Sequence, residues 1–245
     1  MPLYDFRTPR IYLDLPLKAG HAVPLGRDHA NYLLNVLRLE AGDGILLFNG
    51  RDGEWQAVLA GAGKKTLAAE VRDQARPQPA PQDLHFLFAP LKHARLDYMV
   101  QKAVELGVSR IQPVITRHTQ VSRLNLDRMY ANAIEAAQQC GVLAVPEVVE
   151  ALPFKSLTAG LAGRLLVFCD EDAEVKDPVA ALATMPPQPL AVLIGPEGGF
   201  SDEERDALLK LPNVIRISLG PRILRADTAA VAALTLVQAV LGDWK

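Results

Sequence analysis

Short apolar runs recur along the chain after residue 83, and each one is followed by a break in the pattern. They span residues 84–90, 111–115, 165–169, 190–194 and 214–219. Short runs bounded by turn residues are typical of buried strands. Other stretches have helical spacing, or are rich in alanine and leucine and poor in glycine and proline. They cover residues 92–106, 130–140 and 223–240. The pattern predicts an α/β domain.

Two of these runs end in turns that contain glycine and proline. The run 190–194 is followed by Gly-Pro-Glu-Gly-Gly at 195–199, and the run 214–219 by Gly220-Pro221. Ser201 stands three residues before Glu204, which is the spacing of a capping box and marks a helix start. Two strand–turn–helix units in series predict a parallel sheet with both turns at one edge, where such sheets bind ligands.

The first 75 residues have a different pattern, in which short strand-like segments alternate with glycine-containing turns. The expected strands are residues 10–13, 45–48, 55–59 and 67–71, with a hairpin turn beginning at Asn49. A helix is expected from Asp28 or His29 onward. Short strands joined in this way predict a small β-barrel. The segment 76–82, RPQPAPQ, is typical of a stiff connector, so we expect domains at 1–75 and 83–245.

The composition of the 245-residue chain is that of an ordinary globular protein, with 49% hydrophobic and 22% charged residues. No apolar run is long enough for a membrane span, and the segment 1–10 lacks the apolar core of a signal peptide. The two cysteines have no metal-ligand spacing. We therefore expect a cytoplasmic protein that uses neither membrane nor metal. A net charge of −2 means that any nucleic-acid contact must come from local basic patches.

A glycine-rich loop after a strand most often means only a tight turn, and the dinucleotide and P-loop fingerprints are missing. The pairing of the two turns is more informative. LIGPEGGFS at 193–201 and ISLGPRILRADTA at 217–229 together resemble the RsmE family of 16S rRNA uridine-N3 methyltransferases, which belong to the SPOUT superfamily. HANYLLNVLRLEAGD at 29–43 and LKHARLDYMVQKAVELGVSRIQPV at 91–114 extend the resemblance over nearly the whole chain.

This resemblance implies a C-terminal SPOUT-type parallel sheet with a trefoil knot, preceded by a PUA-like RNA-binding barrel. It implies an S-adenosylmethionine-dependent methyltransferase that acts on N3 of a uridine in 16S rRNA. The substrate would be free rRNA or the small ribosomal subunit, and the enzyme a homodimer. The two turns would form the cofactor pocket. Its expected residues are Leu193, Ile194, Gly195, Pro196, Glu197, Gly198, Gly199, Ser218, Leu219, Gly220, Leu224 and Thr228.

Uridine N3 must lose its proton before it attacks a methyl group, and the reaction needs no covalent enzyme nucleophile. Catalysis can then rest on positioning and on stabilisation of the uridine anion. Arg222 and Arg225 flank the second turn and are the candidates for that stabilisation. Asp227 offers a carboxylate that could accept a proton, although relatives often carry Thr-Glu where this chain has Ala226-Asp227. The sequence does not identify the general base.

Two basic regions are candidates for contact with the RNA backbone. The residues concerned are Arg7, Arg10, Arg27, His29, Arg38, Lys92, Arg95, Arg117 and Arg123. Those in the predicted barrel are nearly balanced by nearby acidic residues, so an ordinary solvated surface is the alternative there. The others belong to the window 92–128, the most basic of the chain, where solvated helix surfaces are an equal alternative.

Two positions depart from the family pattern, with Gln138 in place of glutamate and Val142 in place of arginine. This looks like the joint loss of a compensating pair. Lys102 and Glu105 are better explained as an i,i+3 ion pair on a helix than as catalytic residues, and the acidic run 170–172 as a solvated loop. The alternative to an enzyme is a non-catalytic RNA-binding protein with the same fold. A nucleotide-binding hydrolase ranks lower because the P-loop lysine is missing.

Overall fold

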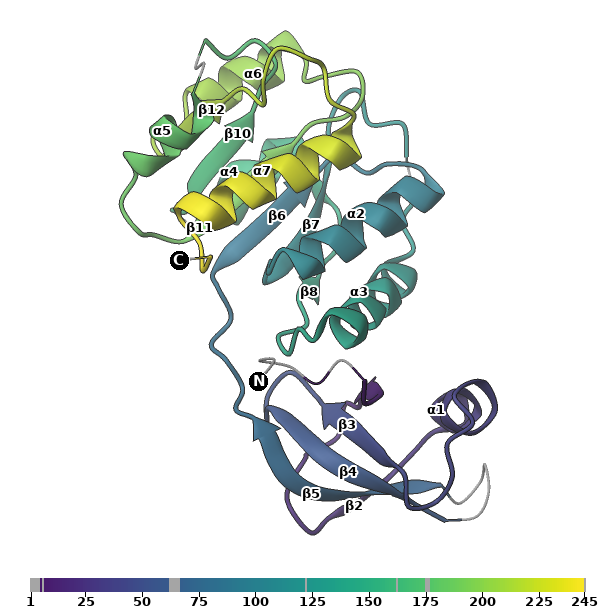
Figure 1. Ribbon diagram of the computed structural model, residues 1–245. Helices are drawn as coiled ribbons and strands as arrows, with labels where there is room; N and C mark the ends of the chain where they lie inside the picture. The colour runs from purple at the N-terminus through teal and green to yellow at the C-terminus, as the bar shows by residue number, and fades with distance from the viewer. Residues whose placement is uncertain are drawn as a thin grey trace. The chain divides into compact units, whose positions relative to one another are not determined.

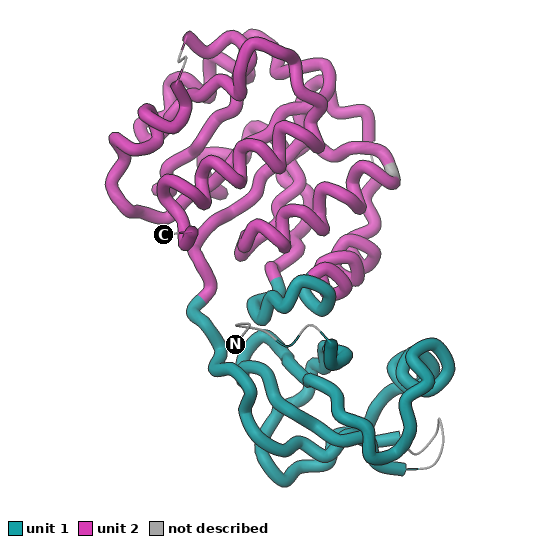
Figure 2. The backbone as a smooth tube through the Cα atoms, in the orientation of Figure 1, with its two compact units in different colours: residues 1–80, 137–145 teal, residues 81–136, 146–245 magenta. Residues whose placement is uncertain are grey.

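The computed structural model describes residue 5 and residues 7–61, 67–121, 123–161, 163–174 and 177–244. The chain forms two compact units, coloured separately in Figure 2. Unit 1 comprises residues 1–80 and 137–145, and unit 2 comprises residues 81–136 and 146–245. The first break lies within the proline-rich segment. The return of residues 137–145 to unit 1 is not expected from the sequence pattern.

Unit 1 contains a five-stranded sheet in the order β1-β3-β4-β5-β2. Its strands are β1 (Arg10–Tyr12), β2 (Ala22–Pro24), β3 (Gly44–Phe48), β4 (Glu54–Ala60) and β5 (Ala68–Arg76). β1 pairs in parallel with β3, and the other neighbours are antiparallel. The sequence pattern missed β2 because its only buried residue is Val23, which leaves no alternation to detect. β5 continues to Arg76, which the sequence assigned to the connector.

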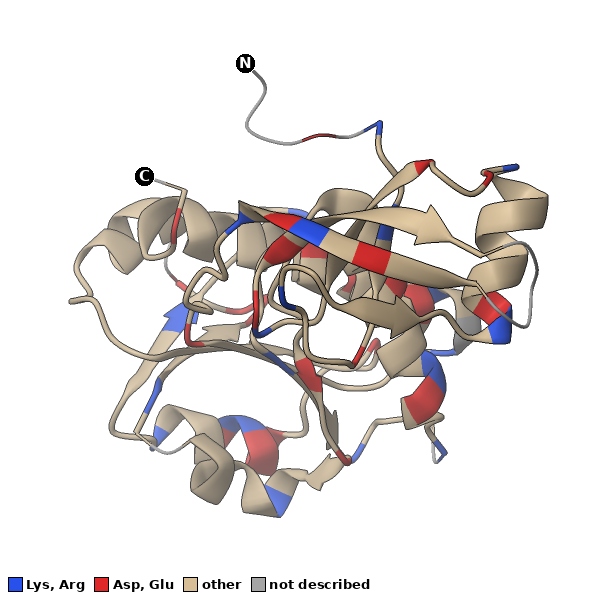
Figure 3. Ribbon diagram, turned by 90° about the horizontal axis from the view of Figure 1, so that it is seen from below, with Lys and Arg blue, Asp and Glu red and all other residues tan. Residues whose placement is uncertain are grey.

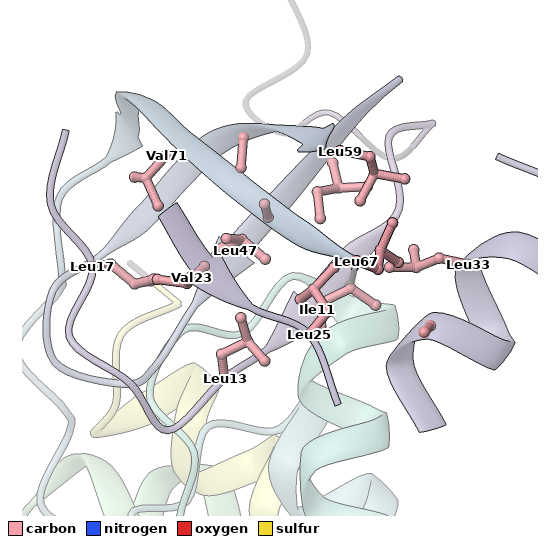
Figure 4. Packing of buried hydrophobic residues seen from close by; sticks show 14 residues of the cluster. Ile11, Leu13, Leu17, Val23, Leu25, Leu33, Leu47, Leu59, Leu67 and Val71 are labelled. Atoms are coloured by element: carbon pink, nitrogen blue, oxygen red, sulfur yellow. The ribbon is translucent and has the colours of Figure 1, made fainter. Parts of the chain in front are cut away.

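Buried side chains of this sheet pack with a short helical segment to form the core of unit 1 (Figure 4). Helix α1 (Arg27–Asn31) continues directly into η1 (Tyr32–Val36), a turn of π-helix. Leu33 is fully buried and belongs to the same cluster as Ile11, Leu47 and Leu59. Tyr32 and Val36, in contrast, are exposed. The segment thus buries one apolar face and leaves a second apolar surface in solvent.

Three charged side chains, of which Arg10 and Glu54 are buried and Arg76 is partly buried, form a network in unit 1. Glu54 begins β4, is only 2% exposed and accepts hydrogen bonds from both Arg10 and Arg76. Burial alone would raise the pKa of Glu54, but the hydrogen bonds from the two guanidinium groups outweigh it, and the pKa is lowered. The carboxylate is therefore charged at neutral pH and balanced by its two partners.

The same network holds the segment 137–145. Arg10 Nη1 donates to the main-chain oxygen of Gln138 at 3.3 Å, and Arg76 Nη2 donates to that of Gly141 at 3.0 Å. Gln138 Oε1 accepts from the amide nitrogen of Tyr12 at 2.8 Å. A glutamine oxygen accepts this hydrogen bond as a glutamate oxygen would. The departure from the family pattern at residue 138 therefore keeps an acceptor in place.

Unit 2 is built on a seven-stranded sheet in the order β12-β10-β11-β6-β7-β8, with β9 also paired to β7. Every pairing is parallel, which confirms the predicted parallel α/β sheet. The strands are β6 (Leu84–Phe88), β7 (Arg110–Ile115), β8 (Glu147–Val148), β9 (Leu152–Pro153), β10 (Leu165–Cys169), β11 (Leu190–Ile194) and β12 (Val214–Ile217). β8 and β9 are too short for any pattern to reveal.

Helices cover both faces of the sheet of unit 2 (Figure 1). They are α2 (His93–Glu105), α3 (Leu126–Cys140), η2 (Phe154–Ser156), α4 (Leu157–Leu161), α5 (Pro178–Ala183), α6 (Asp202–Leu209) and α7 (Ala226–Val240). α2 and α7 lie side by side on one face, where buried Gln238 donates to the main-chain oxygen of Leu106. α4 and α6 pack Leu157 and Leu208 against the other face. None of the described helices has the length and apolar character to cross a membrane.

Candidate functional site

A cavity opens at the edge of the sheet where the adjacent strands β10, β11 and β12 end. It consists of two adjoining hollows of about 230 and 80 Å³. The residues shared by both are Cys169, Glu171, Ile223, Leu224 and Ala229. The first glycine loop (residues 195–199) lines the larger hollow, and the second glycine loop (residues 218–225) lines both. Parallel strands thus bring two loops that are distant in sequence to one site.

The first glycine loop has local reasons for its composition. A β-carbon at Gly195 would lie 2.7 Å from the ring of Phe200, so only glycine lets that ring pack over the loop. Gly199 has a φ of 70°, in the left-handed region that favours glycine. The loop leads into α6, where Ser201 and Glu204 exchange hydrogen bonds. The predicted capping box is confirmed.

The same glutamate ties the first glycine loop to the segment after β7. While one oxygen of Glu204 completes the capping box, the other accepts from the amide nitrogen of Arg117 at 2.8 Å. The next residue, His118, places Nδ1 3.1 Å from the carbonyl oxygen of Gly198 and 3.0 Å from that of Gly199. Sequence reasoning missed these links because the linked residues are 80 to 87 positions apart in the chain.

The second glycine loop presents side chains to solvent. Gly220 has a φ of 108°, and Ile223 is 92% exposed. Arg222 and Arg225 are both exposed, and Arg225 is the N-cap residue of α7. Within the described part of the chain, neither arginine forms an ion pair. Asp227 instead accepts a hydrogen bond from the next amide nitrogen in the first turn of α7, at 2.9 Å.

The loop after β10 forms a wall of the cavity that sequence reasoning missed. Asp170 is 6% exposed and accepts hydrogen bonds from Arg205, at 2.7 Å, and from Arg216. The expectation of a solvated acidic loop is therefore wrong at this residue. Burial raises the pKa of Cys169 to about 12, with a further contribution from the Asp170 carboxylate, so the thiol stays protonated at neutral pH. Glu171 lines both hollows.

Most of the predicted cofactor and catalytic residues line this cavity. They are Ile194, Gly195, Pro196, Glu197, Gly199, Ser218, Leu219, Gly220, Arg222, Leu224 and Arg225. Leu193 requires a correction, because it is fully buried in the cluster packed under α4 and α6. Alternate residues of a strand point to opposite faces, so Ile194 and Leu193 cannot share one surface. Gly198, Asp227 and Thr228 lie outside the residues that line the cavity.

The charge of the basic window 92–128 is largely neutralised by acidic partners, several of them from outside the window. Figure 3 shows basic and acidic residues mixed along the ribbon. The pairs are Arg95–Glu197, Lys102–Glu105, Arg110–Glu147, Arg117–Glu203 and Arg128–Asp97. The second pair confirms the predicted i,i+3 interaction. Lys92 and Arg123 are exposed and have no ion pair among the residues that the structure describes.

The basic residues of unit 1 that the sequence assigned to RNA contact have different surroundings. Arg7, Arg27 and Arg38 are exposed. His29 is half-buried, and burial lowers its pKa despite the nearby Asp28 carboxylate. Arg10 is only 7% exposed and pairs with Glu54, so its assignment to an RNA-contacting surface is wrong. The partner lies 44 residues away, and no local pattern reveals it.

Two protein-family models match the chain. The model of the RNA methyltransferase domain matches residues 78–238, and that of the RNA methyltransferase PUA domain matches residues 25–72. The chain is also similar to a protein of Rickettsia conorii named Ribosomal RNA small subunit methyltransferase E. The two are 31% identical over 230 residues, which cover 94% of each chain.

Solved structures that are similar over nearly the full length include two with a bound cofactor. One is a Ribosomal RNA small subunit methyltransferase E from Neisseria gonorrhoeae bound to S-adenosyl methionine, with a TM-score of 0.87 and 28% identity, covering 98% of this chain and 100% of that one. The other is a putative methyltransferase of Legionella pneumophila in complex with the bound cofactor SAM. Its TM-score is 0.84 at 31% identity, and the match covers 95% of this chain and 98% of that one.

Proposed function

Because this chain belongs to the ribosomal RNA small subunit methyltransferase E family, we propose that it methylates N3 of a uridine in 16S rRNA. The family and its cofactor-bound structures make it an S-adenosylmethionine-dependent rRNA methyltransferase. The choice of base and atom follows the family resemblance, and the chemistry of the site supports it. One observation carries the proposal: two exposed arginines without acidic partners stand on a loop that lines the cavity.

The cavity suits the parts of S-adenosylmethionine. Ile194, Leu219 and Leu224 offer apolar surface for an adenine ring, and the main-chain groups of the glycine loops are open to approach. The carboxylate of Glu171 is available for ribose hydroxyls or for the ammonium group of the amino-acid tail. Glu197 also lines the cavity, but it pairs with Arg95. When bound, the cofactor supplies a methyl group activated by its sulfonium sulfur.

The arginines of the second glycine loop can stabilise the negative charge that forms during the reaction. Loss of the N3 proton leaves a negative charge spread over the uracil ring. A guanidinium stays protonated and cannot act as a base, but it stabilises such an anion. Since no carboxylate neutralises Arg222 or Arg225 in the described chain, both keep their full charge for the substrate.

Exposed basic residues in each unit would hold the RNA backbone. In unit 1 these are Arg7, Arg27 and Arg38, and the exposed Tyr32 and Val36 of η1 would add apolar contacts. In unit 2, Lys92 and Arg123 are the basic residues of the window 92–128 that have no ion pair among the described residues, so they rank above Arg95 and Arg117. Phosphate contacts of this kind position an RNA without reading its sequence.

Two further features are proposals from family membership. The strand order β12-β10-β11 is consistent with a trefoil knot at the glycine loops. The exposed Ile223 and the partly exposed apolar residues of α7 support a homodimer that covers them in the cytoplasm. Light scattering at micromolar concentration checks this, and a monomer would contradict the dimer.

The proposed activity can be tested with labelled methyl donor. Purified protein is incubated with S-adenosylmethionine carrying a deuterated methyl group and with small ribosomal subunits from cells that lack the gene. Nucleosides of the 16S rRNA are then separated and identified by mass spectrometry. Deuterated N3-methyluridine is the expected product. Label in another nucleoside, or on a ribose hydroxyl, would refute the uridine-N3 assignment, and free rRNA run in parallel shows which substrate is preferred.

A further inference from the structure

We propose that His118 is the general base that removes the N3 proton from the target uridine. This inference rests on the proposed function. His118 belongs to the segment after β7 and is exposed, so a large RNA substrate can reach its ring. Nothing in the sequence motif of the two glycine loops points to it. The tautomer of the ring, its rigid support and its position beside the cavity all fit this role.

The contacts of His118 fix its tautomer. Nδ1 lies 3.1 Å and 3.0 Å from two main-chain carbonyl oxygens, those of Gly198 and Gly199. A carbonyl oxygen can only accept a hydrogen bond, so Nδ1 must carry the hydrogen. In a neutral imidazole the other nitrogen then has a free lone pair. Among the described residues, Nε2 has no hydrogen-bond partner, and it is therefore available as a proton acceptor.

The residues on both sides hold His118 in place. The amide nitrogen of Thr116 donates to Thr119 Oγ1 at 2.9 Å, and the amide nitrogen of Thr119 donates back to the main-chain oxygen of Thr116 at 3.2 Å. The amide nitrogen of Arg117 is anchored by buried Glu204. A base held in this way needs little reorganisation when the substrate binds. The imidazole ring is therefore held at a fixed position relative to the first glycine loop.

The ring also lies beside the cavity. His118 lines a small hollow together with Lys92, Gln120, Pro196 and Glu197. Pro196 and Glu197 line the cofactor cavity as well, so the two spaces share a wall. The small hollow holds only about 20 Å³, so the uracil ring would lie at its mouth, against the exposed His118 ring and next to the proposed methyl-donor site. Lys92 lines the same hollow, so its ammonium group would add positive charge near the uracil anion while it holds an adjacent phosphate.

The N3–H bond breaks, the proton binds Nε2 of His118, and the electron pair of that bond stays on N3. N3 then forms a bond to the methyl carbon, while the electrons of the carbon–sulfur bond remain on sulfur. The products are N3-methyluridine and S-adenosylhomocysteine. The imidazolium returns its proton to solvent, to which the ring is exposed.

His118→Asn separates the base from the support. The amide nitrogen of asparagine can take the place of Nδ1 and still donate to the two carbonyl oxygens, but no group replaces Nε2. We expect cofactor affinity to stay within about twofold by calorimetry. The single-turnover rate should fall by about 10²–10⁴, the range for loss of a general base. A wild-type single-turnover rate in this variant would overturn the proposal.

A more acidic substrate gives a second readout that a purely structural role would not move. RNA with 5-fluorouridine at the target position loses its N3 proton more easily. The fold difference in single-turnover rate between the wild type and His118→Asn should therefore be smaller with this RNA. An unchanged fold difference would contradict a role in proton removal. Asp227→Asn is the matched control. The ratio of the wild-type rate to the Asp227→Asn rate should be the same for RNA with 5-fluorouridine and for RNA with uridine. Identifying the wild-type product by mass spectrometry in the same assay keeps a failure of the uridine-N3 assignment distinct from a failure of His118.

NMR of protein with ¹⁵N-labelled histidine tests the tautomer without any turnover. Of the two neutral tautomers, the Nδ1–H form is expected for His118, and the Nε2–H form would overturn the assignment of Nε2 as the acceptor.

Discussion

Arg10 and Arg225 illustrate how differently two regions of the molecule use the same side chain. Arg10 in unit 1 is buried, pairs with Glu54 and donates to a main-chain oxygen. Arg225 on the second glycine loop of unit 2 is exposed and has no ion pair within the described chain. A buried pair matters to stability because removing one partner leaves the other charge buried without compensation. An exposed, unpaired arginine contributes little to stability, and its charge remains available to a substrate.

The largest expected effect comes from breaking the buried network with Glu54→Gln. The change leaves Arg10 buried without a counter-charge, and the loss of one partner of a buried pair costs about 3–5 kcal/mol. Urea unfolding followed by the fluorescence of Trp55, which packs on the core of unit 1, measures it. The control is Glu70→Gln, which breaks the exposed pair with Arg72 and should cost less than about 1 kcal/mol. Equal costs for the two variants would contradict the assigned role.

The lowered pKa of Glu54 also predicts that the free energy of unfolding depends on pH. Its pKa is lowered in the folded state, so its contribution is fully present above the pKa of an unfolded glutamate, about 4.3. The contribution is lost as the pH falls through the lower folded pKa. The unfolding free energy of the wild type should therefore drop more steeply below about pH 4 than that of Glu54→Gln. Parallel curves for the two proteins would show that the carboxylate does not titrate with folding.

Arg225→Ala is the counterpart in unit 2, and its effect should appear in the rate. A contact that forms with the uridine anion and is weak to neutral uridine acts in the transition state. Removal of one such donor typically costs about 10²–10³ in turnover. Cofactor affinity and melting temperature should stay near wild type. A lower melting temperature with an unchanged single-turnover rate would instead make Arg225 a structural residue like Arg10.

A smaller effect is expected when the first glycine loop is crowded. In Gly195→Ala the new carbon would meet the Phe200 ring at 2.7 Å, and overpacking of this kind typically costs about 1–3 kcal/mol. Cofactor affinity should weaken with it, because the loop must shift. Gly44→Ala is the control, since nothing lies within 4 Å of a β-carbon there. Thermal unfolding and calorimetry of both variants decide whether the loop tolerates the displacement.

The smallest effect is expected from Gln138→Glu, which restores the family residue. A glutamate oxygen can accept from Tyr12 as the glutamine does, so stability should change by less than about 1 kcal/mol. A larger loss, measured by urea unfolding, would mean that the neutral amide is needed beside Arg10.

The sequence predicted most of the sheet of unit 2, its order of elements and the loops that meet at the cavity, because long apolar runs and glycine–proline turns are local signals. It missed β2, β8 and β9, which are too short to carry a period. It also misjudged residues whose role depends on distant partners. Arg10 is buried and pairs with Glu54, and Asp170 is buried and pairs with Arg205 and Arg216. Arg95 is partly exposed but pairs with Glu197.

The direct test of the cofactor cavity is to fill it. Ala229 of α7 lines both hollows, so Ala229→Phe would place a ring where S-adenosylmethionine is proposed to bind. Calorimetric titration with S-adenosylmethionine, beside Ala239→Phe as a control at an exposed position of the same helix, should show an affinity loss of at least about a hundredfold, or about 2.7 kcal/mol, for Ala229→Phe alone. Wild-type affinity in a folded Ala229→Phe protein would show that the cofactor binds elsewhere.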